Sequence, residues 1–307
     1  MDGVKLERLI LYPIINQQGV IVLKRHSEVI ILGLDRPYEE ADVVVFGAPF
    51  DGTVSYRPGS RFGPSAIRNE SYGIETYSPY LDLDLTDIKG YDGGDLPLPF
   101  GDTGAALDRI KSFTQQIVSD GKIPLMLGGE HLVSLPAVEA VLMHHPDLCI
   151  LHLDAHTDLR EDYLGITLSH ATVIRRIWEK VGDGRIWQFG IRSGERYEFE
   201  WAKEHTCLTP FVLEGIEEAL KVIGGRPIYL TIDLDVLDPS VFPGTGTPEH
   251  GGVSFKELMT FLLKLRGQRL VGADLVELAP HYDGSGISTA AACKLLREVA
   301  LIIGSNS

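Results

Sequence analysis

The stretch LCILHLDAHTDLR, residues 148–160, indicates both the fold and the place of its chemistry. It begins with a short apolar run, which is typical of a strand buried on both faces of a parallel sheet. It continues with Asp154, His156 and Asp158 at alternate positions. Because residues i and i+2 of an extended segment point to the same side, Asp154 and His156 share a face, and Asp158 follows as the strand ends. The stretch therefore predicts a polar site at the end of a buried strand.

Similar apolar runs recur along the chain, and helical patterns separate them. The strand-like runs cover residues 43–47, 123–129, 185–190, 227–235 and 269–278. Apolar residues at helical spacing cover 104–121, 254–267 and 286–304. The alternation predicts an α/β fold of three layers, in which helices flank a mostly parallel sheet.

The 307 residues show no internal repeat and no linker-like change of composition. We therefore expect a single domain over residues 41–307. Residues 1–40 contain two further strand-like runs, GVIVLK (19–24) and EVIILGL (28–34), which we expect to form an N-terminal elaboration of the same domain at a sheet edge. The composition of YDGGDL (91–96) predicts a turn.

The charge balance bears on the partners of the chain. Lys and Arg number 28 and Asp and Glu 43, which gives a formal net charge of −15. This balance disfavours a nucleic acid or an anionic membrane as partner and mildly favours a cationic ligand. The first residues form no signal-peptide pattern, and no stretch approaches the roughly 18 apolar residues of a membrane span. We expect a cytoplasmic protein.

Four of the apolar runs end in side chains that can bind metal or act as a general base. In open α/β sheets, ligands collect at the carboxyl ends of the strands. Three of these ends carry the candidate metal ligands His131, Asp154, His156, Asp158, Asp233 and Asp235, and the fourth carries Glu277. Any one of them alone would more often form a turn or cap a helix. Their joint occurrence at strand ends predicts a single site.

Four clustered carboxylates cannot all stay ionised without cations. Two divalent cations would balance the charge, and ligation dominated by carboxylates with some imidazole suits Mn²⁺. A pair of such ions can activate water as a nucleophile. The residues themselves therefore predict a hydrolytic centre with two metals.

At this point the motifs resemble a known family. LGGEH (127–131), DAHTDLR (154–160), SHAT (169–172), TIDLDVLDPS (231–240) and VELAP (276–280) are similar to those of the ureohydrolases, which include arginases and agmatinases. The likeness covers roughly residues 30–304. GAPFDGTVSYRPGSRFGPSAIR (47–68) and FPGTGTPEHGG (242–252) resemble the bacterial agmatinase branch.

The resemblance implies an arginase-like fold with about eight strands, two Mn²⁺ ions per chain and hydrolysis of a guanidino group. It implies that one ion is bound by His131, Asp154, Asp158 and Asp233, and the other by Asp154, His156, Asp233 and Asp235. Asp154 and Asp233 would then bridge the two ions. The family commonly forms trimers or hexamers, so a homo-oligomer is expected.

Three residues receive catalytic roles from the same resemblance. Asp158 would hydrogen-bond the attacking water and pass its proton to the leaving nitrogen. Glu277 would grip the fork of guanidinium N–H groups. His170, in SHAT, would also lie against the substrate and exchange protons with solvent, which suits an imidazole.

The substrate tail is the least constrained part. The loop LREDYLGITLSHAT (159–172) lacks the Asn and Ser groups with which arginases recognise an amino-acid head. Together with the acids Glu161 and Asp162, this favours a tail ending in an ammonium, and hence cleavage of agmatine to putrescine and urea in polyamine biosynthesis. Guanidinobutyrate, aminopropylagmatine and arginine remain alternatives. Also open are a single-zinc deacetylase of related fold, a phosphoesterase, and a non-catalytic metal cluster.

Overall fold

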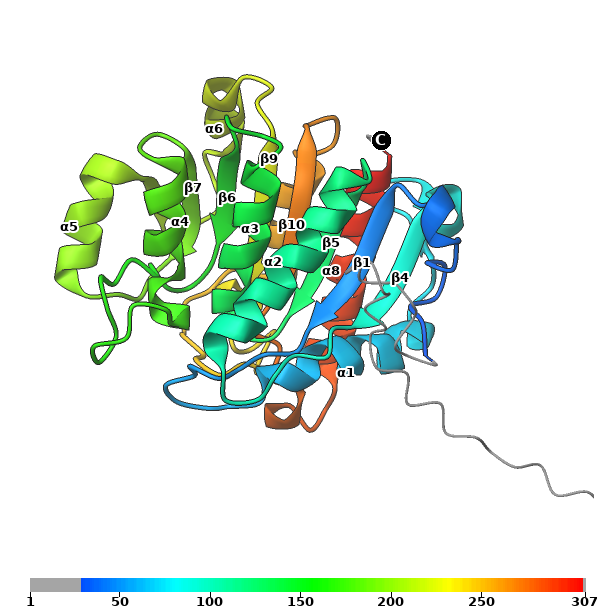
Figure 1. The fold of residues 1–307 in the computed structure, drawn as a ribbon, viewed down its shortest axis with the longest axis horizontal. Helices are drawn as coiled ribbons and strands as arrows, with labels where there is room; N and C mark the ends of the chain where they lie inside the picture. Colours follow the sequence, from blue (N-terminus) through cyan, green and yellow to red (C-terminus); the bar gives the residue numbers. More distant parts are fainter. Residues whose placement is uncertain (1–28, 306–307) are drawn as a thin grey trace, which may run out of the picture.

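The computed structural model describes residues 29–305, and an eight-stranded sheet forms their centre (Figure 1). The strands are β1 (Val43–Ala48), β4 (Gly90–Asp95), β5 (Ile123–Gly128), β6 (Cys149–Leu153), β7 (Ile186–Ile191), β8 (Cys207–Pro210), β9 (Ile228–Asp233) and β10 (Leu270–Val276). They lie in the order β4-β1-β5-β10-β9-β6-β7-β8, and each neighbouring pair is parallel. The predicted parallel α/β sheet is confirmed. A short antiparallel pair, β2 (Tyr77–Ser78) and β3 (Leu83–Asp84), lies outside it.

Helices cover both faces of the sheet. They are α1 (Gly63–Glu70), α2 (Thr103–Ser119), α3 (Ser134–Leu142), α4 (Val173–Val181), α5 (Arg196–His205), α6 (Ile216–Ile223), α7 (Phe255–Leu263) and α8 (Ile287–Gly304). In Figure 1, α2, α3 and α4 lie in front of the sheet and α8, in red, lies behind it. The predicted helices over 104–121, 254–267 and 286–304 correspond to α2, α7 and α8. Within residues 29–305 we find no helix that is long and apolar enough to cross a membrane.

The strands are apolar throughout because both faces of the sheet are buried. In β1, Val43 and Val45 belong to the core shared with α7 and α8. The alternate residues Val44 and Phe46 belong to the core shared with α2, α3 and α4. A two-residue period would have shown one polar face, so the unbroken apolar runs are the expected pattern for a sheet covered on both sides.

Turn-forming residues at YDGGDL (91–96) led to a wrong prediction, because this segment belongs to the edge strand β4. Its backbone pairs with β1, and its side chains contribute little to strand propensity. The buried carboxylate of Asp92 holds it in place by accepting hydrogen bonds from Arg68 Nε at 2.9 Å and from the N–H of Gly94 at 3.0 Å. The other edge strand, β8, was also not predicted.

The strand expected over EVIILGL (28–34) is also wrong in its described part, residues 29–34, which form a turn. The N–H of Leu34 donates to the Ile31 carbonyl at 3.0 Å, and Gly33 has φ +85°. Ile31 and Leu34 are buried in the core, and after the turn the Leu34 carbonyl accepts the N–H of Asp92 in β4 at 3.0 Å. The other run, GVIVLK (19–24), lies outside the described residues.

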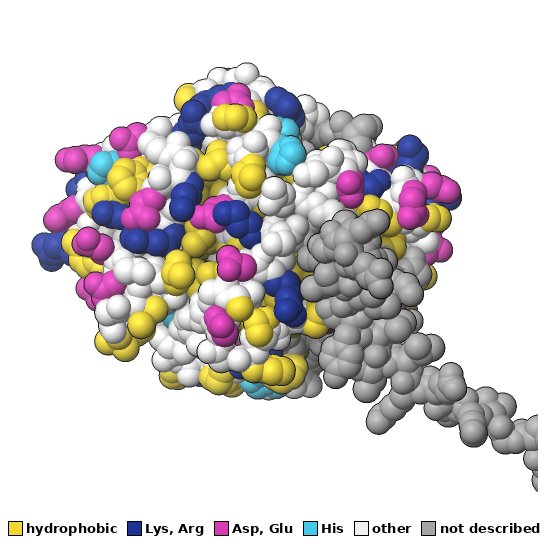
Figure 2. Space-filling model, in the orientation of Figure 1, with side chains coloured by type: hydrophobic (Ala, Val, Ile, Leu, Met, Phe, Trp, Pro, Cys, Tyr) yellow, Lys and Arg dark blue, Asp and Glu magenta, His cyan; other side chains and the backbone are white. Residues whose placement is uncertain are grey.

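Acidic and basic side chains are interspersed over the face shown in Figure 2, where α2, α3 and α4 lie. The net charge of −15 is thus not gathered into one acidic patch on this face. The acids that matter for chemistry lie inside the molecule. Four adjacent strands, β5, β10, β9 and β6, carry the predicted site residues at their carboxyl ends.

Candidate metal centre and active site

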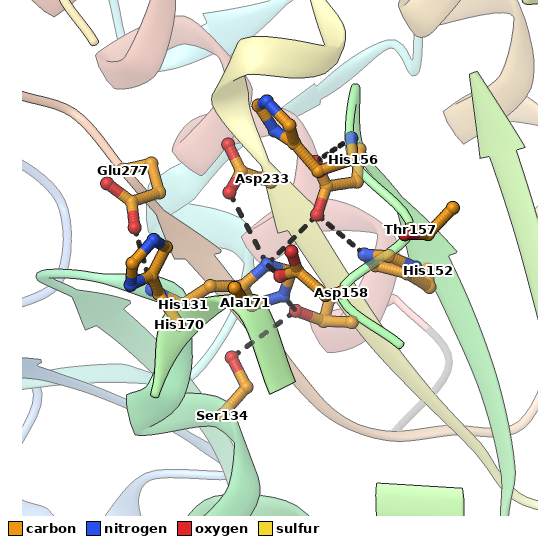
Figure 3. Close-up of polar contacts among 12 residues, drawn as sticks. His131, Ser134, His152, His156, Thr157, Asp158, His170, Ala171, Asp233 and Glu277 are labelled. Carbon is orange, nitrogen blue, oxygen red and sulfur yellow. Dashed lines mark hydrogen bonds and ion pairs between the residues drawn. The ribbon is translucent and has the colours of Figure 1, made fainter. Parts of the chain in front are cut away.

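The strand ends of β5, β6, β9 and β10 bring the predicted site residues together (Figure 3). His131 follows β5, Asp154 follows β6, Asp233 ends β9 and Glu277 follows β10. Five of the six candidate ligands are almost fully buried, and His156 is partly exposed. The second glycine of LGGEH, Gly129, allows the backbone at Phe50 to lie against the end of β5, because a Cβ on Gly129 would lie 1.9 Å from the Phe50 carbonyl oxygen.

One half of the cluster forms around His131. Its Nδ1 lies 3.1 Å from Asp154 Oδ2, 3.1 Å from Asp158 Oδ2 and 3.4 Å from Asp233 Oδ2. These residues come from three separate strand ends. The four residues expected to share one ion therefore point at one place.

The other half forms around His156. Its Nδ1 lies 3.1 Å from Asp235 Oδ2 and 3.4 Å from Asp154 Oδ1. Asp154 thus contacts both histidines, one through each carboxylate oxygen. Asp233 lies between the halves, since it faces His131 with Oδ2 and accepts the N–H of Asp235 with Oδ1 at 2.9 Å.

The ring of His131 is oriented as a metal ligand would be. Its Nε2 lies 2.9 Å from Thr231 Oγ1, and the Thr231 hydroxyl donates to Asp274 Oδ1 at 2.6 Å. Because Thr231 donates its hydroxyl proton to Asp274, it can only accept a hydrogen bond from His131. In the neutral His131 ring, Nε2 must therefore carry the proton. Within the described chain Nδ1 makes no hydrogen bond, although it is buried. In the neutral ring, a lone pair and three carboxylate oxygens face one another, which fits a divalent cation. Burial lowers the pKa of His131, but Asp154, Asp158 and Asp233 outweigh it and raise this pKa well above its usual value, so a proton occupies the place of the cation when none is bound.

The pKa values show how much charge is concentrated here. Burial and the neighbouring Asp154 raise the pKa of Asp158 to about 7. Burial, with Asp235 and Asp154 nearby, raises the pKa of Asp233 well above its usual value. The pKa of Asp154 moves the other way, because the neighbouring imidazoles of His131, His152 and His156 outweigh the effect of its burial. Without cations the cluster must therefore hold protons, and cations could replace them.

Two site residues have left-handed backbone conformations that non-glycine residues rarely adopt. Asp158 has φ +50° and Glu277 has φ +67°. Neighbouring elements fix both residues. The Asp158 carbonyl accepts the N–H groups of Ile174 and Arg175 in α4, and the N–H of Glu277 donates to Gly129 at 2.8 Å. Backbone strain maintained by surrounding structure is common at functional sites.

His170 reaches the site from the loop before α4. Its backbone N–H donates to Thr53 Oγ1 at 3.1 Å, and its Nε2 lies 3.1 Å from Ser55 Oγ. Thr53 is itself fixed by the buried Glu130, which accepts both its N–H and its hydroxyl. Burial lowers the pKa of His170 to about 4, although the contact with Thr53 opposes this shift. The ring is therefore neutral near pH 7.

A cavity of about 300 Å³ opens over the cluster. Its lining includes His131, His156, Asp158, Asp233, His170 and Glu277. Glu277 Oε1 accepts the backbone N–H of His131 at 2.9 Å, which orients the carboxylate at the cavity floor. Glu161 and Asp162, the acids that favoured a cationic tail, are exposed and are not part of this lining. Glu195 and Glu198 line it in their place.

Sequence reasoning missed several residues that support the cluster. His152 donates from Nε2 to Asp154 Oδ2 at 2.8 Å, and its Nδ1 accepts a hydrogen bond from Gln188. Thr231 supports His131 in a similar way. Each residue stands two positions before a predicted ligand on the same strand face, at Asp154 and Asp233. A polar residue at that position in an otherwise apolar run is the signal that could have revealed both.

The parallel sheet and the strand-end cluster together define a metal-dependent α/β hydrolase of the ureohydrolase type. More particularly, the chain belongs to the arginase family, whose model matches residues 41–302.

Known proteins agree with this assignment. An agmatinase of Bacillus anthracis is 52% identical over 287 residues, which cover 92% of this chain and 96% of the relative. A guanidinobutyrase of Pseudomonas aeruginosa is 33% identical, over 85% of this chain and 86% of its own length. The solved structure of an agmatine ureohydrolase of Thermoplasma volcanium has a TM-score of 0.82 at 35% identity, over 90% of this chain and 94% of that structure.

Proposed function

We propose that this protein is an agmatinase, which hydrolyses agmatine to putrescine and urea at a centre that holds two Mn²⁺ ions. The observation that carries this proposal is the convergence of two histidines and four aspartates beneath a cavity whose floor also contains Glu277. The 52% identity to a curated agmatinase supports the choice of substrate.

The residues divide between two ion positions. His131, Asp154, Asp158 and Asp233 would hold one ion, and Asp154, His156, Asp233 and Asp235 the other. The buried Nδ1 of His131, which has no hydrogen bond within residues 29–305, supports the first position. The close grouping of Asp154, His156 and Asp235 supports the second. Two bound Mn²⁺ ions would supply an acidified water as nucleophile near neutral pH.

The chain's own residues would do the remaining work. Glu277 accepts hydrogen bonds from the guanidinium N–H groups and holds the guanidino carbon over the cluster. Asp158 takes the proton of the attacking water and delivers it to the leaving nitrogen. His170, neutral at the cavity wall, contacts the substrate and exchanges the proton with solvent. Ser55 Oγ, 3.1 Å from His170 Nε2, orients that ring.

A second candidate function has one observation in its favour. Arg160 lines the cavity and could pair with a carboxylate tail, which is the feature that distinguishes guanidinobutyrate from agmatine. The identity to the guanidinobutyrase is 33%, well below the 52% to the agmatinase. Agmatine therefore remains the preferred substrate, with guanidinobutyrate as the alternative to test.

The wider biology is part of the same proposal. We infer a cytoplasmic enzyme of polyamine biosynthesis that assembles as a homotrimer or hexamer. We also infer one ureohydrolase domain over residues 41–307, with residues 1–40 as its N-terminal elaboration. The family match over 41–302 supports this division.

Urea release from a panel of guanidino compounds tests the proposal. The Mn²⁺-loaded protein is assayed with agmatine, 4-guanidinobutyrate and arginine, and putrescine is measured by mass spectrometry. We expect kcat/KM for agmatine to exceed the others by about tenfold or more, because a site built for one polar tail group discriminates strongly against another. Absence of urea with every compound, or deacetylation of acetylputrescine by a protein carrying one zinc, would contradict it.

A further inference from the structure

The cavity over the metal centre has a second, more exposed end. Its floor residues His131 and Asp233 have side chains that are 1% and 4% exposed. The side chains of Arg160 and Glu195 are 30% and 57% exposed, so they form the mouth. A substrate whose guanidinium lies against Glu277 would direct its tail toward this mouth.

Arg160 is the only Lys or Arg among the described residues that line the cavity. Its guanidinium Nη2 lies 3.3 Å from Glu195 Oε1, and its Nε lies 3.9 Å from Glu198 Oε2. The guanidinium carbon also lies 5.2 Å from the centre of the Tyr163 ring. Arg160 is therefore already held by two acids and an aromatic ring.

We propose that Glu195 determines the charge of the substrate tail. By pairing with Arg160, Glu195 leaves the mouth with two carboxylates and one guanidinium, so that it attracts a tail ammonium and rejects a tail carboxylate. This proposal rests on the proposed ureohydrolase function and names the residue that separates its two candidate substrates.

The two acids at the mouth have different tasks. Glu198 is buried and accepts hydrogen bonds from Thr157 Oγ1 at 2.7 Å, from the Leu159 N–H at 3.1 Å and from the Glu195 N–H at 2.7 Å. It thereby anchors the loop that carries Asp158. Glu195 lies at the start of α5 with a largely exposed side chain, and a carboxylate has acceptor sites for more than one cation. Glu195 is therefore the acid that can also accept a tail ammonium.

Specificity here combines attraction with repulsion. The mouth has a net charge of one negative unit, which favours an ammonium and opposes a second carboxylate. An anionic tail would need Arg160, whose N–H groups already point toward Glu195 and Glu198. Neutralising Glu195 would remove the attraction for ammonium and release Arg160 for a carboxylate in a single step.

Glu195→Gln tests the proposal by steady-state urea release with agmatine and with 4-guanidinobutyrate. We expect the ratio of the two kcat/KM values, agmatine over guanidinobutyrate, to fall about tenfold, mainly through KM, because one nearby charge has been removed. Metal content and melting temperature should match those of the wild type. The matched control is Glu200→Gln, on the exposed side of the same helix and outside the cavity lining, which should leave the ratio unchanged.

A double variant, Arg160→Gln with Glu195→Gln, separates release of Arg160 from a general loss of charge. Any gain of activity on guanidinobutyrate should disappear in the double variant, because the group that receives the carboxylate is gone. If the wild type is active and Glu195→Gln leaves the ratio unchanged, the proposal is overturned. A gain that persists without Arg160 overturns it as well. A wild type that releases urea from neither compound instead contradicts the proposed function.

Discussion

At the scale of single residues, the site is a set of buried acceptors with too few donors. His131 Nδ1 faces three carboxylate oxygens within 3.4 Å and makes no hydrogen bond in the described chain. Such a group is costly to bury unless a proton or cation satisfies it. Bound cations would therefore offset the free-energy cost of burying these groups.

Asp235→Asn should remove one of two Mn²⁺ ions while leaving the fold intact. Asp235 contacts His156 in the second half of the cluster, and an amide oxygen is a weaker ligand than a carboxylate oxygen. We expect metal analysis to show about one Mn²⁺ per chain and urea release to fall at least about 100-fold. The exposed Asp147→Asn serves as control. Two tightly bound ions and normal turnover in Asp235→Asn would remove Asp235 from the ligand set.

His170→Asn should separate proton transfer from metal binding. His170 contacts Thr53 and Ser55 and, within residues 29–305, forms no hydrogen bond or ion pair with the six proposed ligands, so both ions should remain. Turnover should fall by about 100-fold, within the usual contribution of a general acid or base. The pH–rate profile should also change shape. An unaltered profile with wild-type kcat would exclude His170 from the proton path.

Residue patterns anticipated the cluster but not its supports. Alternation in an extended segment placed Asp154 and His156 on one face, and the structure has both there. His152 and Thr231 stand in runs that otherwise consist of apolar residues. These runs predicted buried strands, and neither residue was assigned a role. Their partners, Gln188 and Asp274, come from neighbouring strands. Only the strand order brings these pairs together.

At the scale of helices and strands, residue propensities gave wrong predictions for segments whose structure depends on backbone pairing, ion pairs or packing. The glycine-rich β4 forms because its backbone pairs with β1 and because Asp92 binds the buried Arg68. Conversely, the apolar residues 29–34 form a turn, because Ile31 and Leu34 pack into the core. Long apolar runs predicted six central strands, since burial on both faces leaves a strong local pattern.

The start of α8 offers a prediction with a defined pH dependence. Asp283 accepts hydrogen bonds from the N–H groups of Ser285 at 3.0 Å and Ser288 at 2.7 Å, which join the loop after Glu277 to this helix. Burial raises the pKa of Asp283, but these hydrogen bonds outweigh it and lower the pKa to about 2. Asp283→Ala should therefore lower the free energy of unfolding by roughly 1 kcal/mol near pH 7.

The sign of the pH effect follows from the lowered pKa. The contribution of Asp283 is complete above its unfolded pKa of about 4 and is lost as the pH falls toward about 2. Denaturant titrations of wild type and Asp283→Ala should therefore differ more at pH 7 than at pH 3. A difference that stays constant or grows on acidification would contradict the assigned hydrogen bonds.

At the scale of the whole molecule, the strand order makes the site. The ligands lie more than 100 residues apart along the chain, from His131 to Asp235, and the adjacent strands β5, β10, β9 and β6 bring them to one edge. Local patterns indicated which strands end in acids, whereas the order of the strands became known only from the structure. Resemblance to a family implied the shared ligand set in advance, but not the strand order that assembles it.

Metal removal should destabilise the entire fold, because the ligands link three central strands, β5, β6 and β9. Dialysis against EDTA should lower the melting temperature by several degrees, and added Mn²⁺ should restore it. Mg²⁺, which binds imidazole poorly, should restore less. Differential scanning calorimetry measures the shift. A melting temperature insensitive to both chelator and Mn²⁺ would contradict a metal shared by these strand ends.

Anomalous diffraction from a crystal of the Mn²⁺-loaded protein tests the central claim most directly, because it locates each ion among named side chains. We predict two manganese peaks per chain, one beside His131 and one beside His156, with Asp154 and Asp233 reaching both. A single peak, or peaks away from these residues, would contradict the account.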